Sequence, residues 1–303
     1  MDKSNAAIAI VCPVYNRADI VMPTLRSFAA QTLRPLRIIL VDNASTDDTL
    51  AVLQQWAHEV SSPDFAVDIL QCATPGAAAA RNAGLEAVAE PWTMFFDSDD
   101  IMPPTHAANV LRQTDGTDIV GWNVDGISDG ASHRLSFLRP GKEQYDNLFH
   151  GGMATQRWAA RTALLRKVDG WNPQVRYWDD IELGARLLAQ NPSIRHLGDS
   201  GIKVMDSATS ITRSATGRPE MATLALQSIE ATLSPVIGAR KARLWCITKL
   251  AIECGIADRE GQRTGLRLLN SIGNIPRRAM WAYRHTRAGL PGAARILHFL
   301  HLL

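Results

Sequence analysis

The octapeptide Phe-Phe-Asp-Ser-Asp-Asp-Ile-Met, residues 95–102, places three carboxylates directly after a short apolar run. Asp97, Asp99 and Asp100 are so close in the chain that their negative charges repel one another. A hard divalent cation that also binds an anionic ligand would relieve this repulsion, because such cations prefer carboxylate oxygens. The alternative is a solvated turn in which aspartates accept backbone hydrogen bonds or cap a helix. The first hypothesis is therefore a site for a metal and a phosphate.

Strand-like apolar runs and helical patterns alternate around this stretch. The strand-like runs cover residues 8–14, 37–41, 67–71, 92–96 and 118–124, and the helical patterns cover 20–30, 49–60, 77–88 and 104–112. This alternation predicts an α/β fold with a mostly parallel sheet flanked by helices. We expect a catalytic domain over residues 1–217 and a basic, amphipathic helical region over residues 218–303.

Polar residues follow the ends of the first four predicted strands. They are Asn16 and Arg17, then Asp42 and Asn43, then residues 74–76, and finally residues 97–100. Open α/β sheets bind ligands beyond the carboxyl ends of their strands. The sequence therefore predicts that these four loops meet around one crevice.

Each loop offers groups that suit a nucleotide. Asp42 can accept a hydrogen bond from a base or ribose, whereas Asp47 is expected to cap the next helix. Gly76 allows close backbone approach, and Arg81 either faces a pyrimidine or phosphate or serves as a structural arginine. The chain has neither of the glycine-rich phosphate loops, Gly-x-x-x-x-Gly-Lys-Ser/Thr or Gly-x-Gly-x-x-Gly. Neutralisation of phosphate charge must then come from a metal, from arginine, or from both.

A second acidic group follows two aromatic residues, Tyr177 and Trp178. Asp179, Asp180 and Glu182 begin a helical pattern, where acids are favoured by the helix dipole. Capping accounts for one acid more easily than for three. Another of them can take the proton from an attacking hydroxyl group.

Five motifs occur in an order that resembles a known family. They are Pro13-Val14-Tyr15-Asn16, Val41-Asp42-Asn43-Ala44-Ser45-Thr46-Asp47, Ala80-Arg81-Asn82-Ala83-Gly84, Asp97-Ser98-Asp99 and Trp178-Asp179-Asp180. Together they resemble the inverting family 2 glycosyltransferases of the GT-A fold, over about residues 6–215. The resemblance implies a Rossmann-like mixed, mostly parallel sheet and transfer of a sugar, with inversion, from a nucleotide-sugar, most often UDP-linked.

By this resemblance, Asp42 lies on the uracil or ribose side, Asp99 coordinates Mn²⁺ or Mg²⁺, and Asp97 supports the ribose or the metal. Asp206 stands where family members often carry a metal-binding histidine. The complete set expected to contact the nucleotide-sugar is Pro13, Tyr15, Asn16, Asp42, Gly76, Arg81, Asp97, Ser98 and Arg213. Arg213 belongs to a segment similar to the mobile loop that closes over the diphosphate.

The resemblance also implies that Asp180 is the general base, with Asp179 in place of the family's glutamate. Candidate acceptor contacts are Trp178, Asp179, Gly152 and Met153. Gly151, Gly152 and Met153, which open the segment before Trp158, would form with Trp171 and Trp178 an apolar platform for a sugar ring. The alternative for each tryptophan is packing in the core. The acceptor is expected to be a saccharide, a lipid-linked molecule or another hydroxyl compound, in bacterial polysaccharide or glycoconjugate synthesis.

Charge and cysteine content bear on the surroundings of the protein. Residues 240–303 contain twelve Lys or Arg against three acids, whereas residues 1–239 contain 20 against 27. The basic helices are expected to pack on the catalytic domain or another subunit, or to rest on anionic lipid through Arg277, Arg278, Arg284 and Arg287. The four cysteines lack metal-site spacing, and no apolar run reaches the ~20 residues that span a bilayer. We expect a cytoplasmic protein, peripheral on the inner face of the membrane if lipid contact occurs, with no nucleic-acid partner.

Two other functions remain open at this stage. A nucleotidyltransferase could use a related sheet and metal, but it should carry a glycine-rich, arginine-containing loop where this chain has Tyr15-Asn16-Arg17. A non-catalytic nucleotide-sugar-binding protein would keep Asp42 and Asp99 but would not depend on Asp180.

Overall fold

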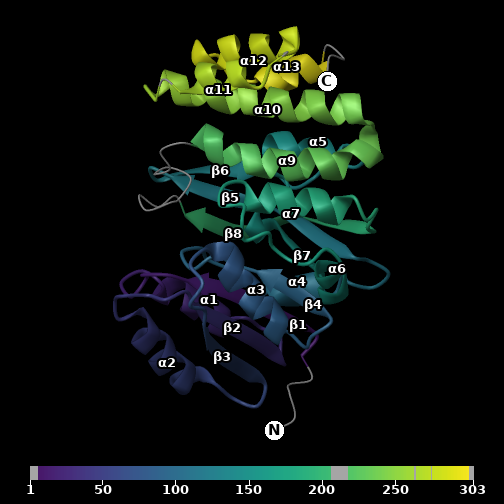
Figure 1. The fold of residues 1–303 in the computed structure, drawn as a ribbon. Coiled ribbons are helices and arrows are strands. Elements are labelled where there is room, and N and C mark those ends of the chain that lie inside the picture. Colours follow the sequence, from purple (N-terminus) through teal and green to yellow (C-terminus); the bar gives the residue numbers. More distant parts are fainter. Residues whose placement is uncertain (1–5, 206–217, 263, 274, 300–303) are drawn as a thin grey trace. The chain divides into compact units, whose positions relative to one another are not determined.

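The computed structural model describes residues 6–205, 218–262, 264–273 and 275–299. The chain divides into two compact units. Unit 1 comprises residues 1–143, 152–173 and 190–208, and unit 2 comprises residues 144–151, 174–189 and 209–303. Figure 1 shows the elements of both units in the colours of the sequence.

Unit 1 is built on a mixed eight-stranded sheet. Its strands are β1 (Ile8–Val14), β2 (Leu36–Asp42), β3 (Phe65–Gln71), β4 (Trp92–Phe95), β5 (Ile119–Ser128), β6 (Ala131–Leu135), β7 (Trp158–Arg161) and β8 (Ile194–Met205). The order is β3-β2-β1-β4-β7-β5-β6, with β8 paired to β5. The β3-β2-β1-β4 part is parallel, whereas β7 runs antiparallel to both β4 and β5. The predicted α/β sheet is confirmed in its first, parallel half.

Helices cover both faces of the parallel strands. The helices of unit 1 are α1 (Met22–Ala29), α2 (Thr49–Val60), α3 (Ala77–Ala87), α4 (His106–Leu111) and α6 (Thr162–Lys167), with a 3-10 turn, η1 (Thr155–Arg157). Alternate residues of β1 from Ile8 to Val14 share a buried cluster with Phe28 of α1 and Trp56 of α2. This burial on one face follows from the two-residue period of a strand.

The opposite face of β1 carries α3 at very short range. A Cβ atom on Gly84 would lie 2.3 Å from Cγ1 of Val11, so only glycine lets the helix lie this close to the strand. Arg81 lies three residues earlier on α3 and is buried. The close packing of α3 therefore fixes Arg81 against the sheet.

Unit 2 is helical. It contains most of α5 (Glu143–His150), then α7 (Asp179–Leu188), α9 (Arg218–Ile237), α10 (Ala239–Arg259), α11 (Gly265–Ser271), α12 (Arg277–Arg287) and α13 (Ala293–Phe299). Helix α10 packs between α9 and α12, as Figure 1 shows. Tyr145 of α5 and Ile181 of α7 belong to the same buried cluster as Leu226, Trp245 and Leu250 of the later helices.

The compact units are each composed of several segments of the chain, and the domain boundary expected at residue 217 stays a prediction. The segments 144–151 and 174–189 group with the C-terminal helices because α5 and α7 bury their apolar faces there. Over the described residues, none of the helices combines the length and the apolarity needed to cross a bilayer.

Candidate active site

The loops after β1, β2 and β4 leave the sheet at the same edge. The strands are parallel, with Val14 opposite Asp42 and Val11 opposite Phe95. The backbone N–H of Asn43 donates to the carbonyl of Val14 at 2.8 Å, and that of Phe96 donates to Val11 at 3.0 Å. Unit 1 thus brings together the predicted residues of these loops at one edge, as the strand order requires.

Asn16 fixes the loop after β1 to the loop after β2. Its φ of 48° lies in the left-handed region, which asparagine tolerates better than most residues. Its backbone N–H donates to Ser45 Oγ at 3.0 Å, and its Oδ1 accepts from the N–H of Thr46 at 2.8 Å. Asn16 therefore shapes the edge, while a direct nucleotide contact stays a prediction.

Asp42 ends β2 with a buried carboxylate, 2% exposed. Its Oδ2 accepts a 3.4 Å hydrogen bond from the N–H of Ser45, whereas its Oδ1 has no partner among the residues that the structure describes. A buried polar atom without a partner is costly. This oxygen is therefore suited to accept a hydrogen bond from a bound base or ribose.

Asn43 fastens the loop after β3. Its side-chain amide donates to the carbonyls of Cys72 at 3.0 Å and Thr74 at 2.7 Å, and its Oδ1 accepts from the N–H of Gly76 at 2.8 Å. Gly76 has a φ of 122°, a conformation that side-chain-bearing residues rarely adopt, and a Cβ there would meet nothing within 4 Å. The start of α3 is therefore open to a ligand that approaches its backbone.

Asp97 is held from two sides. Arg81 Nη2 donates to its Oδ1 at 2.8 Å, and Gln156 Nε2 donates to its Oδ2. The Arg81 guanidinium also stacks over the Trp171 ring, 4.3 Å from its centroid. Of the two readings of Arg81, the geometry shows a structural role that orients Asp97, and contact with a pyrimidine or phosphate stays a prediction.

The acidic turn continues with Asp99 and Asp100. Asp99 Oδ2 lies 4.0 Å from Arg17 Nη2. Asp100 is 1% exposed, its Oδ1 accepts from the N–H of Met205 at 2.9 Å, and its Oδ2 has no hydrogen-bond partner within the described chain. Burial, followed by the nearby Asp97 charge, raises the pKa of Asp100 well above its ordinary value.

Buried hydrogen bonds hold the backbone of this turn. Thr24 Oγ1 lies 3.0 Å from the carbonyl of Ser98 and 2.8 Å from that of Asp100. Ser98 is itself buried, whereas Tyr15 at the neighbouring loop is 54% exposed. Thr24 and Gln156 were not singled out in the sequence, because neither lies in an acidic or strand-end motif.

The acidic turn has donors that suit a hard cation. Mg²⁺ and Mn²⁺ prefer carboxylate oxygens, and Mg²⁺ usually binds one or two protein carboxylates together with substrate phosphates. Burial contributes most to the raised pKa of Asp100, and the repulsion from Asp97 that adds to it is what such a cation would relieve. In the described ranges, no group of three His, Cys, Asp or Glu side chains is placed to hold a metal. Asp206, the third predicted ligand, lies outside the described residues, as does Arg213.

Two of the tryptophans named with the predicted sugar platform belong to the core of unit 1. Trp158 and Trp171 are buried and contact Phe95 edge to face, with centroids 6.0 and 5.2 Å apart. Met153 is fully buried, and its carbonyl accepts from Trp158 Nε1 at 2.7 Å. The expected alternative, core packing, holds for both tryptophans, and the acceptor role of Gly152 and Met153 stays a prediction.

Unit 2 carries the second acidic group at the start of α7. Trp178 precedes the helix with a φ of 60°, in the left-handed region, and its carbonyl accepts from the N–H of Glu182 at 2.9 Å. Glu182 is buried and accepts from Arg186 and from Ser228 Oγ, so this acid is structural. Asp179 and Asp180 are half-buried in the first turn, and Asp180 Oδ1 accepts from the N–H of Ile181 at 2.8 Å.

Side chains of α10 hold the residues that precede Asp180. Lys249 Nζ lies 4.6 Å from the Trp178 ring centroid, and Trp178 stacks on Tyr177 at 4.9 Å. The Tyr177 hydroxyl donates to Glu253 Oε1 at 3.1 Å. Burial lowers the pKa of Lys249 to about 8, against the opposing effect of Glu253 and Asp180. The position of Asp180 therefore depends on α10, which sequence reasoning did not connect with it.

The part of the chain that carries the parallel strands and the acidic turn matches a known family. The family model "Glycosyl transferase family 2" matches residues 9–167, more than half of the chain. The chain therefore belongs to glycosyl transferase family 2.

Two curated relatives are similar to parts of the chain. The uncharacterized glycosyltransferase YibD of Escherichia coli K12 is 28% identical over 41% of this chain and 36% of its own length. A UDP-Glc:alpha-D-GlcNAc-diphosphoundecaprenol beta-1,3-glucosyltransferase, WfaP of Escherichia coli, is 30% identical over 35% of this chain and 40% of its own length. Each match thus spans less than half of the relative.

Solved structures share the fold over nearly the whole chain. Residues 1–349 of S. aureus TarS in complex with UDP give a TM-score of 0.68 at 16% identity, covering 98% of this chain and 91% of that one. The mannosyltransferase PcManGT from Pyrobaculum calidifontis, in complex with GDP-Man and Mn²⁺, gives 0.58 at 18% identity, covering 97% and 87%. The GT-A-like α/β fold with a C-terminal helical region is therefore confirmed.

Proposed function

We propose that this protein transfers a sugar from a UDP-sugar to an acceptor hydroxyl group with inversion at the anomeric carbon. The observation that carries the proposal is the edge of unit 1: within the described residues a buried oxygen of Asp42 has no hydrogen-bond partner, and Arg81 and Gln156 hold Asp97 of the acidic turn. The S. aureus neighbour was solved with UDP, which supports a uridine nucleotide. The side chains at this sheet edge and the UDP-bound neighbour both favour a UDP-sugar as the donor.

The donor would bind across the loops of this edge. Asp42 Oδ1 accepts from the base or ribose, and the backbone at Gly76 lies open to the rest of the nucleotide. Asp97 and Asp99 would hold Mn²⁺ or Mg²⁺, with Arg81 and Gln156 keeping the Asp97 carboxylate in one orientation. When bound, this cation supplies positive charge that stabilises the departing diphosphate.

Asp180 would act on the acceptor. Its carboxylate takes the proton from the attacking hydroxyl as the new bond to the anomeric carbon forms, and the nucleoside diphosphate leaves from the opposite face. One displacement gives inversion without a covalent sugar intermediate. Asp179 and Trp178 adjoin Asp180 and are the proposed acceptor contacts in unit 2.

A lipid-linked acceptor is the first one to test. The Escherichia coli relative WfaP is named for transfer to a GlcNAc-diphosphoundecaprenol. Transfer to a synthetic GlcNAc-diphospho-lipid, measured by product mass, would establish this acceptor class. NMR of the product would show whether its anomeric configuration is inverted relative to the donor.

The decisive experiment separates binding from transfer. UDP-, GDP- and dTDP-sugars are first compared by thermal shift with Mn²⁺, and transfer is then measured with the donor that binds. Asp180→Asn should lower kcat by about 10³-fold or more, in the range expected for loss of a general base, while UDP still binds with Mn²⁺. Asp42→Asn should instead weaken donor binding.

Glu220→Gln is the matched control, because it removes an exposed acid of unit 2 that is neither the proposed base nor a proposed acceptor contact. Unchanged turnover in Asp180→Asn would reject Asp180 as the base. Binding of UDP without any transfer in the wild-type protein would favour the non-catalytic alternative.

A further inference from the structure

The C-terminal helices carry positive charge that no acid in the same stretch balances. Residues 261–303 contain seven arginines and no Asp, Glu or Lys. On α12, Arg277, Arg284 and Arg287 are exposed and form no ion pair with any acid that the structure describes. This is unusual for a solvated helix face, where both signs of charge normally alternate.

The three acids of residues 240–303 bind groups other than the arginines of α12. Glu253 is buried and binds Tyr177 and Arg218, and Glu260 pairs with Arg218. Asp258 accepts from the backbone N–H groups of Gly265 and Leu266 and from the Tyr283 hydroxyl. Their charge is therefore used to hold the helices together, and none of the three forms an ion pair with Arg277, Arg284 or Arg287 in the part of the chain that the structure describes.

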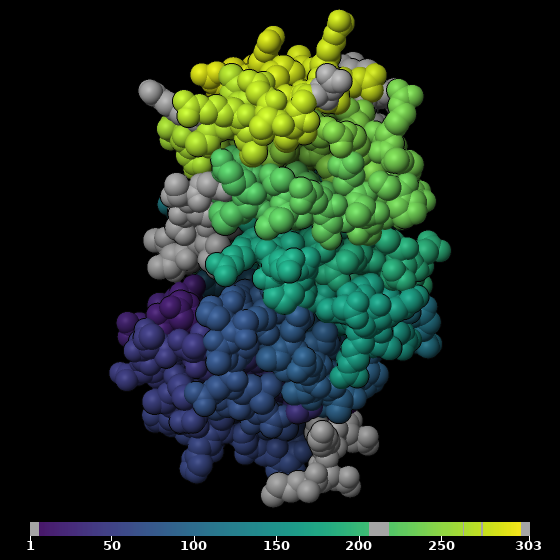
Figure 2. Space-filling model, in the orientation of Figure 1, coloured from purple at the N-terminus to yellow at the C-terminus, as the bar shows by residue number. Residues whose placement is uncertain are grey.

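Helix α12 has one packed face and one face in solvent. Ala279, Ala282, Tyr283 and Thr286 are buried. The outer face carries Trp281, 38% exposed, which stacks on His285 with centroids 4.6 Å apart. The space-filling view shows side chains of the C-terminal helices, in yellow, packed against one another (Figure 2). A tryptophan among arginines on the exposed face of a helix is typical of contact with a lipid headgroup layer.

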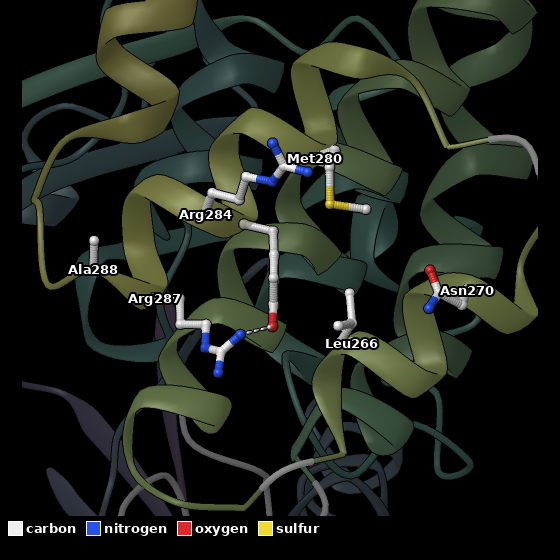
Figure 3. A pocket seen from close by; sticks show the side chains of 7 residues that line it. Leu266, Asn270, Met280, Arg284, Arg287 and Ala288 are labelled. Atoms are coloured by element: carbon white, nitrogen blue, oxygen red, sulfur yellow. Dashed lines mark hydrogen bonds between the residues drawn. The ribbon is translucent and has the colours of Figure 1, made fainter.

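A pocket of about 600 Å³ lies beside this face, between α11 and α12. Leu266, 37% exposed, and Met280 give it an apolar lining, while Arg284 and Arg287 supply guanidinium groups (Figure 3). Arg287 Nη1 donates to the Tyr283 hydroxyl at 3.3 Å, which fixes one of the two arginines. Guanidinium groups bind phosphate oxygens well, and the apolar lining suits the first part of an acyl chain.

We propose that the outer face of α11 and α12 docks on an anionic phospholipid bilayer, with one lipid phosphate held in the pocket between Arg284 and Arg287. Two features favour a bilayer over a soluble anion. Trp281 and Leu266 expose apolar surface beside the arginines, and the pocket itself is part apolar and part basic. A soluble polyanion would use the charge but leave the apolar surface in water.

The test uses the full chain and vesicles of phosphatidylcholine with 30% phosphatidylglycerol (about one lipid in three anionic, to give a negative surface). Sedimentation measures the bound fraction. Neutralising the face by R277Q, R278Q, R284Q and R287Q together should weaken binding by roughly 100-fold or more, because each basic residue near such a surface contributes about fivefold. Trp281→Ala in an otherwise native chain should weaken binding by about fivefold or more.

A matched control removes four exposed positive charges from unit 1, at Arg26, Arg112, Lys167 and Arg195. This variant should bind the vesicles as the wild type does. Equal losses in the control and the α12 variant would overturn the proposal, because they would show a response to net charge alone. Circular dichroism of both variants checks that the helices are retained.

Further outcomes would assign the face to another occupant and equally overturn the proposal. One is that the protein binds vesicles of pure phosphatidylcholine as strongly as it binds the anionic vesicles. Others are full displacement from the vesicles by millimolar inorganic phosphate, tighter binding to RNA than to the vesicles, and a dimer in solution that the α12 substitutions dissociate. The vesicle assay contains no donor sugar, so its result is independent of the proposed transferase activity.

Discussion

His106 is a residue whose ionisation should limit stability in acid. Its ring is 1% exposed, lies edge to face with Trp122 at 4.4 Å, and neither ring nitrogen has a hydrogen-bond partner within the described ranges. Burial lowers its pKa to about 3, from an ordinary value of 6.5. As the pH falls, the unfolded chain therefore takes up a proton at His106 before the folded chain does. The contribution of neutral His106 to the free energy of unfolding is complete above pH 6.5 and is lost as the pH falls toward 3.

We predict that His106→Phe loses less stability in acid than the wild type. Between pH 7.5 and pH 5 the free energy of unfolding of the wild type should fall by about 2 kcal/mol more than that of the variant. Urea unfolding at the two pH values measures the difference. The control is His58→Gln, at an exposed histidine. Equal pH dependence in His106→Phe and the wild type would show that His106 is not a buried neutral group.

Lys249 should support turnover only while it is charged. Its ammonium group lies over the Trp178 ring, and the charged form is favoured by Glu253 and Asp180, although burial lowers its pKa to about 8. A cation held over an aromatic ring contributes ~0.5–2 kcal/mol, which would keep Trp178 and the adjoining Asp180 in position. Above pH 8 this contribution should be lost as the lysine becomes neutral.

We therefore predict that Lys249→Met lowers kcat by about 3- to 30-fold below pH 8 and that the two proteins converge at higher pH. Lys249→Arg keeps the positive charge at high pH, so its kcat should change less with pH than that of the wild type. The measurement is kcat against pH for the three proteins, with the nucleotide-sugar saturating. A constant ratio between wild type and Lys249→Met across pH 7–10 would contradict the prediction.

At the scale of the elements, the close packing of α3 on β1 gives a prediction about stability. Gly84→Ala would place a Cβ 2.3 Å from Cγ1 of Val11, so the helix or the strand would have to shift. Overpacking of this kind typically costs ~1–3 kcal/mol. Val11→Ala removes the obstructing methyl groups, so Gly84→Ala should cost less when it is added to Val11→Ala than when made alone. Chemical unfolding of the four proteins of this double-mutant cycle checks the coupling, and strict additivity would contradict it.

The elements that could be predicted from the sequence are those with a clear apolar period. Ile8–Val14 and Thr49–Val60 have the expected bounds, because β1 is an apolar run and α2 has a single apolar stripe. Strands β6, β7 and β8 were not predicted. β7 has only four residues, Trp158–Arg161, and β8 mixes apolar with polar residues, is partly exposed, and has two glycines and an irregular register against β5. Such strands are specified by their partners in the sheet and not by a local pattern.

At the scale of the whole molecule, the strand-end rule predicted the edge of unit 1 but not the contacts that complete it. Gln156 binds Asp97 across 59 positions of the chain, and no local motif marks it. The packing of residues 174–189 with α9 and α10 also joins segments that are far apart in the chain. It depends on which apolar faces meet, and no local pattern marks it. Sequence patterns therefore placed the strand-end loops, whereas tertiary packing supplied the residues that hold them. The meeting of Asp180 with the acids of unit 1 stays a prediction.

Ligand binding offers a test of the acidic turn in the intact chain. A ligand that binds only the folded state stabilises it by ~2.7 kcal/mol at a concentration of 100 times its Kd, which raises Tm. We expect UDP with Mn²⁺ to raise Tm clearly more than UDP with EDTA, because Asp97 and Asp99 would bind the cation together with the diphosphate. The difference should be lost in Asp99→Asn.

Asp115→Asn is the matched control, because it removes one exposed aspartate from unit 1 outside the turn. It should respond to Mn²⁺ as the wild type does. Since crowded carboxylates repel one another in the absence of a cation, Asp99→Asn should also have an equal or higher Tm than the wild type in EDTA. A Mn²⁺-dependent rise in Tm that survives in Asp99→Asn would remove this residue from the metal site, and the nearby Asp97 and Asp100 would then be the carboxylates to replace next.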